Sequence, residues 1–403
     1  MKDKWRDVQV AIIDEISLVT PKLFGALSFR VCLARRESRS AQPDLYMEAG
    51  HMFGAIPIVI LAGGFLQLAP FDYKQRVSFL MPSNPLAADE HVYGLRCFSC
   101  GVTDVFLLRR TFRFKDITTG VECPCLPSCF EYLPDPRGQE MPADLWDRLQ
   151  RCVVEGRSDP RLQDPRQKAG YEMAVVWEAV ARLLQYRARR EAHEAGQMLM
   201  YVQAIDVPHK VVLSKKEFRR ALLKVNMTST GNRLGMLPFF TGMRVRLTAK
   251  LSGKQRIMQD SVGAVVGTEF HPREFENDDW RLESDHVAKA RGYVRLRRMP
   301  IAVYVKFDGY EEDFGFGHGV VLVQPSSSSW TFNTYDDDDV RSRREVAMNR
   351  LQIPLAPEKV RTVQTAQGMS MDSVIIMLSK GSMMSIDDWW LHIYVMLSRV
   401  RTI

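Results

Sequence analysis

Two short runs near the N-terminus are predominantly apolar. They cover residues 8–13 and 56–61, are rich in isoleucine and valine, and lack the regular polar alternation of a half-exposed strand. Runs of this kind are typical of central strands in a parallel sheet, which is covered on both faces. A further apolar run covers residues 374–378. The pattern therefore predicts an α/β fold with parallel sheets.

Apolar residues recur at helical spacing over residues 171–194, and Gly196 can end that helix. The stripe predicts core packing and consists of Met173, Val176, Trp177, Val180, Leu183 and Leu184. A second helix is expected over residues 389–398.

Between residues 244 and 323 the pattern changes to short strand-like pieces separated by turn-forming residues. These pieces are "RVRLTA", "SVGAVVG", "GYVRLRR", "IAVYVKF" and "GVVLVQ". Their spacing predicts a small all-β module. The low-complexity stretch 325–339 is expected to be a loop, and the proline- and cysteine-rich stretch 116–140 an irregular insertion.

The charge of the chain is compatible with a polyanionic partner but does not identify one. The 403 residues include 55 basic and 48 acidic side chains, a formal net charge of +7 spread along the whole length. The N-terminus lacks the pattern of a secretory signal or a transit peptide, and no apolar run approaches the roughly 18–20 residues that span a bilayer. We therefore expect a nuclear or cytosolic protein without a membrane partner, and an organelle stays open.

Seven cysteines, an odd number, favour a reducing compartment over a disulfide framework. Five of them lie in "CFSC" and "CPCLPSC", namely Cys97, Cys100, Cys123, Cys125 and Cys129. A C-x2-C pair can supply two zinc ligands from one turn, whereas the C-x-C-x3-C half departs from the usual spacing. Two interpretations stay open, a zinc-stabilised scaffold and unligated thiols, and the spacing favours the second.

The run 8–13 is followed directly by two carboxylates, Asp14 and Glu15. In an open α/β sheet, ligands bind beyond the carboxyl ends of the strands, where these side chains are expected. One carboxylate there could hold Mg²⁺ and the other could orient an attacking water. Gln67 follows the second run in "ILAGGFLQLAP" and could hydrogen-bond a γ-phosphate or its water. The alternative is that all three are solvated residues at strand ends and turns.

Five sequence blocks occur in the order expected of a superfamily 1 DNA helicase. They are "IIDEISLV", "GGFLQLAP", "LRRTFRF", "TVQTAQGMSMDSVII" and "YVMLSRVRT". The chain resembles the PIF-type (petite integration frequency) helicases, with RecD-like and Helitron helicases as relatives. The resemblance implies two RecA-like parallel-sheet lobes, the first truncated, with an inserted SH3-like β module.

The resemblance also implies roles for single residues in nucleotide hydrolysis. Asp14 matches the Mg²⁺-coordinating aspartate, Glu15 the water-activating glutamate and Gln67 the glutamine that senses the γ-phosphate. Arg113 matches an arginine that reaches the γ-phosphate, and Arg399 matches the arginine finger. A fixed planar cation suits the charge that develops on a transferred phosphoryl group.

Three further positions match the block that couples the nucleotide to bound single-stranded DNA, namely Thr362, Gln367 and Gly368. The implied activity is that of an ATPase and DNA helicase, with ATP and Mg²⁺, moving 5′ to 3′ on single-stranded DNA or DNA junctions and serving repair and recombination. The implied layout is a first lobe at 1–115, an insertion with helices at 116–196, a second lobe starting at 197–243, the β module with its loop at 244–345, and the end of the second lobe at 346–403.

One element of the family pattern is missing from these residues. A phosphate loop requires G-x4-G-K-[ST], and the partial match "LSGKQ" at 251–255 lacks the first glycine and the hydroxyl. We therefore expect the chain to be N-terminally incomplete, the part of a helicase that follows the phosphate loop. The alternative is a non-catalytic nucleic-acid-binding remnant. Gly64 and Ala69 also depart from the pattern, as do residues 364–366.

Overall fold

The chain divides into two compact units in the computed structural model. Unit 1 comprises Met1–Leu162, Ala366–Ser373 and Met383–Ile403, and unit 2 comprises Gln163–Thr365 and Val374–Ser382. The described residues are 2–35, 49–65, 68, 79, 89–108, 113–116, 119–123, 126–132, 140–154, 159–223, 225–253, 255–275, 292–335, 343–382 and 384–401. The layout of lobes that the family resemblance implies stays a prediction, which this division into units does not test.

A two-stranded parallel sheet lies in unit 1, as the first two apolar runs predict. Strands β1 (Val10–Ile13) and β2 (Ile58–Leu61) pair in register from Val10 opposite Ile58 to Ile13 opposite Leu61. The side chains of Ala11, Ile13, Val59 and Leu61 pack on the core of the unit. Those of Val10, Ile12, Ile58 and Ile60 are between 45 % and 67 % exposed. The expectation that both faces are covered is therefore wrong, because the helices pack on one face.

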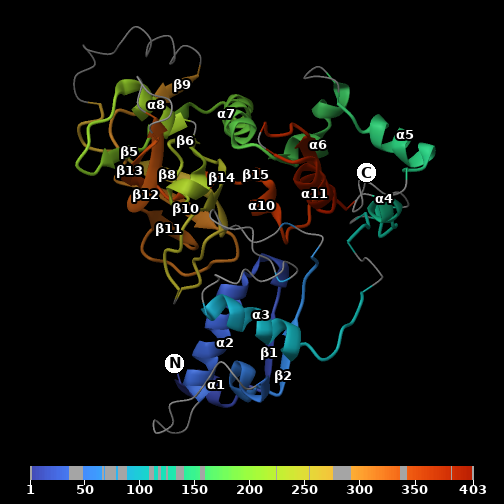
Figure 1. Cartoon of the computed structure of the whole chain (residues 1–403). Helices are drawn as coiled ribbons and strands as arrows, with labels where there is room; N and C mark the ends of the chain where they lie inside the picture. Colours follow the sequence, from blue (N-terminus) through green and yellow to red (C-terminus); the bar gives the residue numbers. More distant parts are fainter. Residues whose placement is uncertain are drawn as a thin grey trace. The chain divides into compact units, whose positions relative to one another are not determined.

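Two long helices, α2 (Pro21–Arg35) and α3 (Asp89–Gly101), pack against each other in unit 1 (Figure 1) and contribute to that core. They approach closely at Gly94, where an added Cβ would lie 1.8 Å from the carbonyl oxygen of Pro21. The Ser28 hydroxyl lies 3.1 Å from the Tyr93 hydroxyl and accepts the backbone N–H of Phe53. The other described elements of unit 1 are α1 (Lys2–Arg6), η1 (Ile16–Leu18), η2 (Ala49–Ala55), α4 (Leu126–Tyr132), α5 (Ala143–Arg151) and α11 (Ile386–Leu397). The short helix η3 (Pro160–Gln163) lies at the boundary between the two units in sequence.

Helix α11 confirms the helix expected near the C-terminus and begins where the Ser385 hydroxyl accepts the backbone N–H of Asp388. Helix α4 lies inside the stretch that was expected to be irregular. Within the described part of the chain, no helix is both long and apolar enough to cross a membrane.

A three-stranded parallel sheet lies in unit 2. Strand β3 (Tyr171–Ala174) pairs with β15 (Val360–Thr362) and β16 (Val374–Met377), so the apolar run at 374–378 is a strand as predicted. Helix α7 covers Trp177–Glu194 only. The expected helix from residue 171 is wrong at its start because residues 171–174 are buried between two parallel strands, where strand pairing outweighs helical spacing. The helices α6 (Pro165–Ala169) and α10 (Val363–Ala366) flank this sheet in sequence.

The predicted all-β module is a five-stranded antiparallel sheet of order β11-β10-β8-β7-β14. Its strands are β7 (Arg244–Leu247), β8 (Val262–Glu269), β10 (Ala302–Phe307), β11 (Val320–Val323) and β14 (Leu355–Pro357). The piece "GYVRLRR" contributes β9 (Tyr293–Arg295) to a different sheet, in which β4 (Leu199–Gln203) lies between β9 and β6 (Met236–Phe239). That the module is SH3-like stays a prediction.

Residues 326–335 of the stretch expected to be a loop form a long strand instead, and residues 336–339 of it lie outside the described residues. Strand β12 (Ser326–Tyr335) pairs with β13 (Arg343–Gln352), which also pairs with β5 (Ile205–Pro208) (Figure 1). Trp330, Phe332 and Thr334 alternate along β12 and are buried. This period of two outweighs the low complexity of the serine run. Helix α8 (Lys215–Leu223) and η4 (Met227–Thr230) also belong to unit 2.

An ion pair buried under this sheet joins β13 to β5. The Arg350 side chain is fully buried and donates from Nε and Nη2 to the two carboxylate oxygens of Asp206, both at 2.8 Å. It also donates to the carbonyls of Arg233 and Ala221, and its guanidinium lies 5.0 Å from the Trp330 ring centroid. The Asp206, Arg233 and Ala221 partners of this cation all belong to unit 2.

We expect Asp206→Asn to lower the free energy of unfolding by about 3–5 kcal/mol, because it leaves the Arg350 charge buried without its counter-charge. Urea unfolding followed by tryptophan fluorescence measures the loss. The matched control is Asp308→Asn, which removes an exposed partner of Arg244 and should cost at most about 1 kcal/mol. Equal losses in the two variants would show that burial of the Arg350–Asp206 pair does not matter.

Candidate functional site

A tight turn follows the two strands of unit 1 and carries the predicted carboxylates. Glu15 has a left-handed backbone, with φ 51° and ψ 46°. The Ile16 N–H donates to the carbonyl of Ala62, and the Ala62 N–H donates to that of Ile13, each at 2.9 Å. An added Cβ on Gly63 would lie 2.9 Å from the Ile16 nitrogen. The turn is thus closed by backbone bonds and by the absence of a side chain at position 63.

The two carboxylates differ in surroundings. Asp14 is exposed, and its Oδ1 accepts the Glu15 N–H at 2.8 Å. The Oε2 atom of Glu15 is buried and has no hydrogen-bond partner among the described residues. A buried carboxylate oxygen without a partner is costly unless a bound group satisfies it. Glu15 therefore has an oxygen available for a water or for the hydration shell of an ion.

The residues present fit a magnesium ion brought by a nucleotide. Mg²⁺ in nucleotide sites is held by one or two carboxylates together with phosphates and waters. In the described ranges, no group of three or more histidine, cysteine, aspartate or glutamate side chains could hold a metal alone. Asp14 would hold the ion, which would supply positive charge opposite the phosphates, and the unsatisfied oxygen of Glu15 would face a water.

The predicted coupling block lies beside Glu15. A Cβ on Gly368 would lie 3.9 Å from Oε1 of Glu15, and Gly368 has φ +80°, a conformation that favours glycine. Further along, the Met371 N–H donates to the Arg399 carbonyl at 2.8 Å, and the Arg401 N–H donates to the Met371 carbonyl at 3.1 Å. One segment therefore connects the surroundings of Glu15 to the backbone of Arg399.

The two predicted arginines lie together at the end of α11. Arg113 donates from Nη1 to the Ser398 carbonyl at 2.8 Å. Arg399 is 2 % exposed and donates to the Val395 carbonyl at 3.1 Å and to the Ser398 hydroxyl at 2.7 Å. Burial, and secondly the charge of Arg113, lower the pKa of Arg399 to about 10, while the Glu15 carboxylate opposes this shift. Arg399 thus stays charged at neutral pH.

An aromatic stack that the sequence did not suggest as part of the site supports this arginine pair. Phe114 stacks on Phe130 at 5.1 Å with an interplanar angle of 8°, and Phe130 contacts the Tyr394 ring edge-on at 5.1 Å. Burial raises the pKa of Tyr394, and the charges of Arg399 and Arg113 oppose the shift. The stack connects the residue next to Arg113 to α11. Two sequence signals could have indicated it, namely the "FRF" tripeptide and the aromatic residues of the final helix.

The other predicted site residues are Thr362, Gln367 and Gln67. Thr362 ends β15 in unit 2, is 8 % exposed and lies 3.1 Å from the Thr365 hydroxyl. Gln367 is partly buried next to Gly368. Gln67 lies outside the described residues, as does Cys125. The roles of all these residues stay predictions.

The structure does not bring the described cysteines together as ligands. Cys97 and Cys100 lie on α3, where Cys97 is buried and its thiol contacts the Ser28 hydroxyl at 3.8 Å. Burial raises the pKa of Cys97, so the protonated thiol is favoured over the thiolate that zinc needs. Cys123 and Cys129 are buried in a separate segment that includes α4. A zinc site stays a prediction.

Comparisons with known proteins identify the fold. No protein-family model matches the sequence, and no curated protein matches it. The chain is similar to the crystal structure of the Pif1 helicase from Candida albicans, with 17 % identity and a TM-score of 0.50 over 100 % of this chain and 72 % of that one. The chain is also similar to a structure that describes DNA unwinding at forked double-stranded DNA by two coordinating Pif1 helicases. The identity is 16 % and the TM-score is 0.50, over 100 % of this chain and 69 % of that one.

At this identity the likeness concerns the fold alone. The chain has a mixed α/β fold with parallel sheets that matches the RecA-like fold of the Pif1 structures. The resemblance to PIF-type helicases drawn from the sequence blocks is confirmed at the level of the fold.

We expect the thiols to separate by reactivity. Iodoacetamide at pH 8 should modify the exposed Cys100 and Cys152 first and the buried Cys97 at least about tenfold more slowly, since each 1.4 kcal/mol of opening free energy slows reaction tenfold. Mass spectrometry of peptides measures the rates, with urea-unfolded protein as the control. If added zinc instead protects both Cys97 and Cys100, the two cysteines are metal ligands.

Proposed function

We propose that this chain is part of the motor of an ATP-dependent DNA helicase that moves 5′ to 3′ along single-stranded DNA. The observation that carries the proposal is the gathering within unit 1 of Glu15, Gly368 and the Arg113–Arg399 pair from three distant parts of the sequence. A carboxylate with an unsatisfied buried oxygen, beside two cations, suits an attacking water and a phosphoryl group.

Each residue has a distinct part in the proposed reaction. Asp14 would hold the Mg²⁺ of the nucleotide, which supplies charge that stabilises the leaving phosphate oxygens. Glu15 would accept a hydrogen bond from the attacking water and orient it. The guanidinium groups of Arg113 and Arg399 would stabilise charge on the transferred phosphoryl group.

The proposed coupling to DNA runs through residues 366–373. This segment approaches Glu15 at Gly368 and pairs with the backbone of residues 399–401 at Met371. A shift of the segment on binding a strand would move the water-orienting carboxylate relative to the arginines. Hydrolysis would then depend on bound DNA.

The proposed partner is single-stranded DNA or a DNA junction, with roles in repair and recombination in a nuclear or cytosolic setting. A Pif1 helicase that shares this fold is described as acting on forked double-stranded DNA. The net charge of +7 is compatible with such a polyanion.

A second candidate is a nucleic-acid-binding protein without ATPase activity. It is favoured by one observation, that residues 1–403 contain no G-x4-G-K-[ST] segment to hold the β- and γ-phosphates. For hydrolysis to occur, other residues would have to supply the contacts that such a loop makes to the phosphates. The two candidates differ in whether DNA stimulates ATP hydrolysis.

The test uses protein isolated from its source cells, with its intact mass recorded. We expect oligo(dT) to stimulate ATP hydrolysis, and Glu15→Gln to lower kcat by about 10²–10⁴-fold because the water loses its general base. ATP and oligo(dT) binding should be retained.

The control is Glu122→Gln, which changes an exposed carboxylate of the same unit and should leave kcat unchanged. Full activity of Glu15→Gln would refute the assigned role. Wild-type protein that binds oligo(dT) but hydrolyses no ATP would favour the second candidate.

A further inference from the structure

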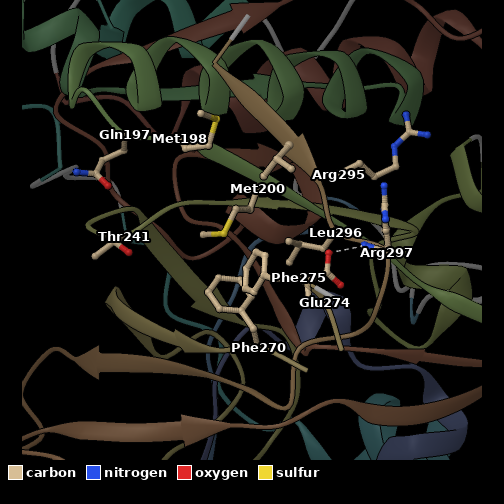
Figure 2. Close-up of a pocket in the computed structure, with 11 residues that line it drawn as sticks. Gln197, Met198, Met200, Thr241, Phe270, Glu274, Phe275, Arg295, Leu296 and Arg297 are labelled. Atoms are coloured by element: carbon tan, nitrogen blue, oxygen red, sulfur yellow. Dashed lines mark hydrogen bonds between the residues drawn. The ribbon is translucent and has the colours of Figure 1, made fainter. Parts of the chain in front are cut away.

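A cavity of about 190 Å³ opens in unit 2 beside β4 and β9 (Figure 2). All of its lining residues belong to unit 2, whereas Asp14 and Glu15 belong to unit 1. Its walls are mostly apolar and include Met198, Met200, Phe270 and Phe275. A cavity of about 150 Å³ accommodates benzene, so this one has room for a single aromatic ring.

The aromatic wall is formed by a pair of phenylalanines. The Phe270 and Phe275 rings meet edge-on at 5.2 Å, with an interplanar angle of 72°. The Phe275 side chain is 61 % exposed, and that of Met198 is 41 % exposed. Stacking of a flat ring on a large aromatic side chain that is exposed at the mouth of an apolar cavity is favourable.

The polar groups of the cavity are arranged at its sides. Figure 2 shows Arg295 and Arg297 on one side and Gln197 and Thr241 on the other. The arginines attract an anionic group, and the amide and hydroxyl can hydrogen-bond the edge of a heterocyclic ring.

The acidic residue of the cavity is already engaged by backbone. Both carboxylate oxygens of Glu274 accept backbone N–H groups, from Arg297 at 2.9 Å and from Arg298 at 2.8 Å, and Figure 2 draws the first of these bonds. The residue is 7 % exposed. These bonds fix residues 270–275 against the chain that follows β9. The lining has two arginines and one carboxylate, so positive charge is in excess.

We propose that this cavity binds one unstacked base of a single-stranded nucleic acid. The base stacks against Phe275, and Arg295 binds the adjoining phosphate. A purely apolar ligand would make no use of Arg295, whereas a base next to a phosphate combines a flat ring with a negative charge at one edge. This site goes beyond the proposed function because it requires no ATP hydrolysis and lies outside the unit that carries Glu15.

The test measures equilibrium binding by fluorescence anisotropy with two probes of equal length, labelled oligo(dT) and a labelled abasic deoxyribose-phosphate chain. Phe275→Ala should weaken oligo(dT) binding roughly 5- to 30-fold and leave abasic binding unchanged, because only the stacking is lost. Phe275→Trp should retain the affinity. Arg295→Gln should weaken both probes and reduce the salt slope by about 1.

The control is Phe316→Ala, which removes another exposed phenylalanine of unit 2 and should change neither affinity. Circular dichroism checks that each variant is folded. Equal weakening of both probes by Phe275→Ala, or no effect on oligo(dT), would overturn the proposal. The proposal would also be overturned if ATP displaced a bound nucleotide probe from the wild-type protein but not from Phe275→Ala. That result would mean that the cavity holds a free nucleotide.

The outcomes also separate the two proposals. Base-dependent binding through Phe275, in protein that hydrolyses no ATP, would refute the proposed helicase function and support the base site.

Discussion

The left-handed backbone of Glu15 is the constraint on which the candidate site depends. A non-glycine residue in this region costs on the order of 1–2 kcal/mol, so the surroundings must hold it there. The bonds of Ile16 and Ala62 across the strand ends do so, and Gly63 leaves the space the turn needs. The consequence is that the Glu15 side chain leaves the direction of β1 and comes close to Gly368 instead of continuing along the strand.

The arginines that support the fold and those that suit a ligand differ in the charge of their hydrogen-bond partners. Arg350 has both oxygens of Asp206 as partners, and the pair is buried inside unit 2. The guanidinium of Arg399, in contrast, donates to neutral oxygens of Val395 and Ser398. Its pKa of about 10 reflects burial near a second cation, with the Glu15 carboxylate as opposing charge. Two arginines and one carboxylate leave positive charge at this place, which a phosphate group would neutralise.

Local pattern predicted the strands that are continuously apolar and missed those specified by longer-range pairing. The runs at β1, β2 and β16 are strands, because hydrophobic content and branching suffice there. The period at residues 171–176 matched a helix, yet β15 and β16 draw residues 171–174 into a sheet from almost 200 residues away. Similarly, the aromatic stack on α11 and the approach of Gly368 to Glu15 are contacts between distant segments, which no single-sequence window contains. The family resemblance named Asp14, Glu15, Arg113 and Arg399, but their proximity became visible only in the structure.

The packing of unit 1 connects the order of the site to the segment proposed to sense DNA. Only one face of the β1–β2 sheet packs on the core, and Ile12 on the other face is 67 % exposed. A two-stranded sheet supported on one face contributes little stability by itself. The position of Glu15 therefore depends on the turn at Gly63 and on residues 366–373, which are joined to the end of α11 by the backbone bonds of Met371. Met371 is 1 % exposed, and both its N–H and its carbonyl bond the backbone of residues 399–401, so a shift of this segment has to involve the chain that carries Arg399. In the proposed mechanism, the position of residues 366–373 therefore sets how the Glu15 carboxylate faces the arginines.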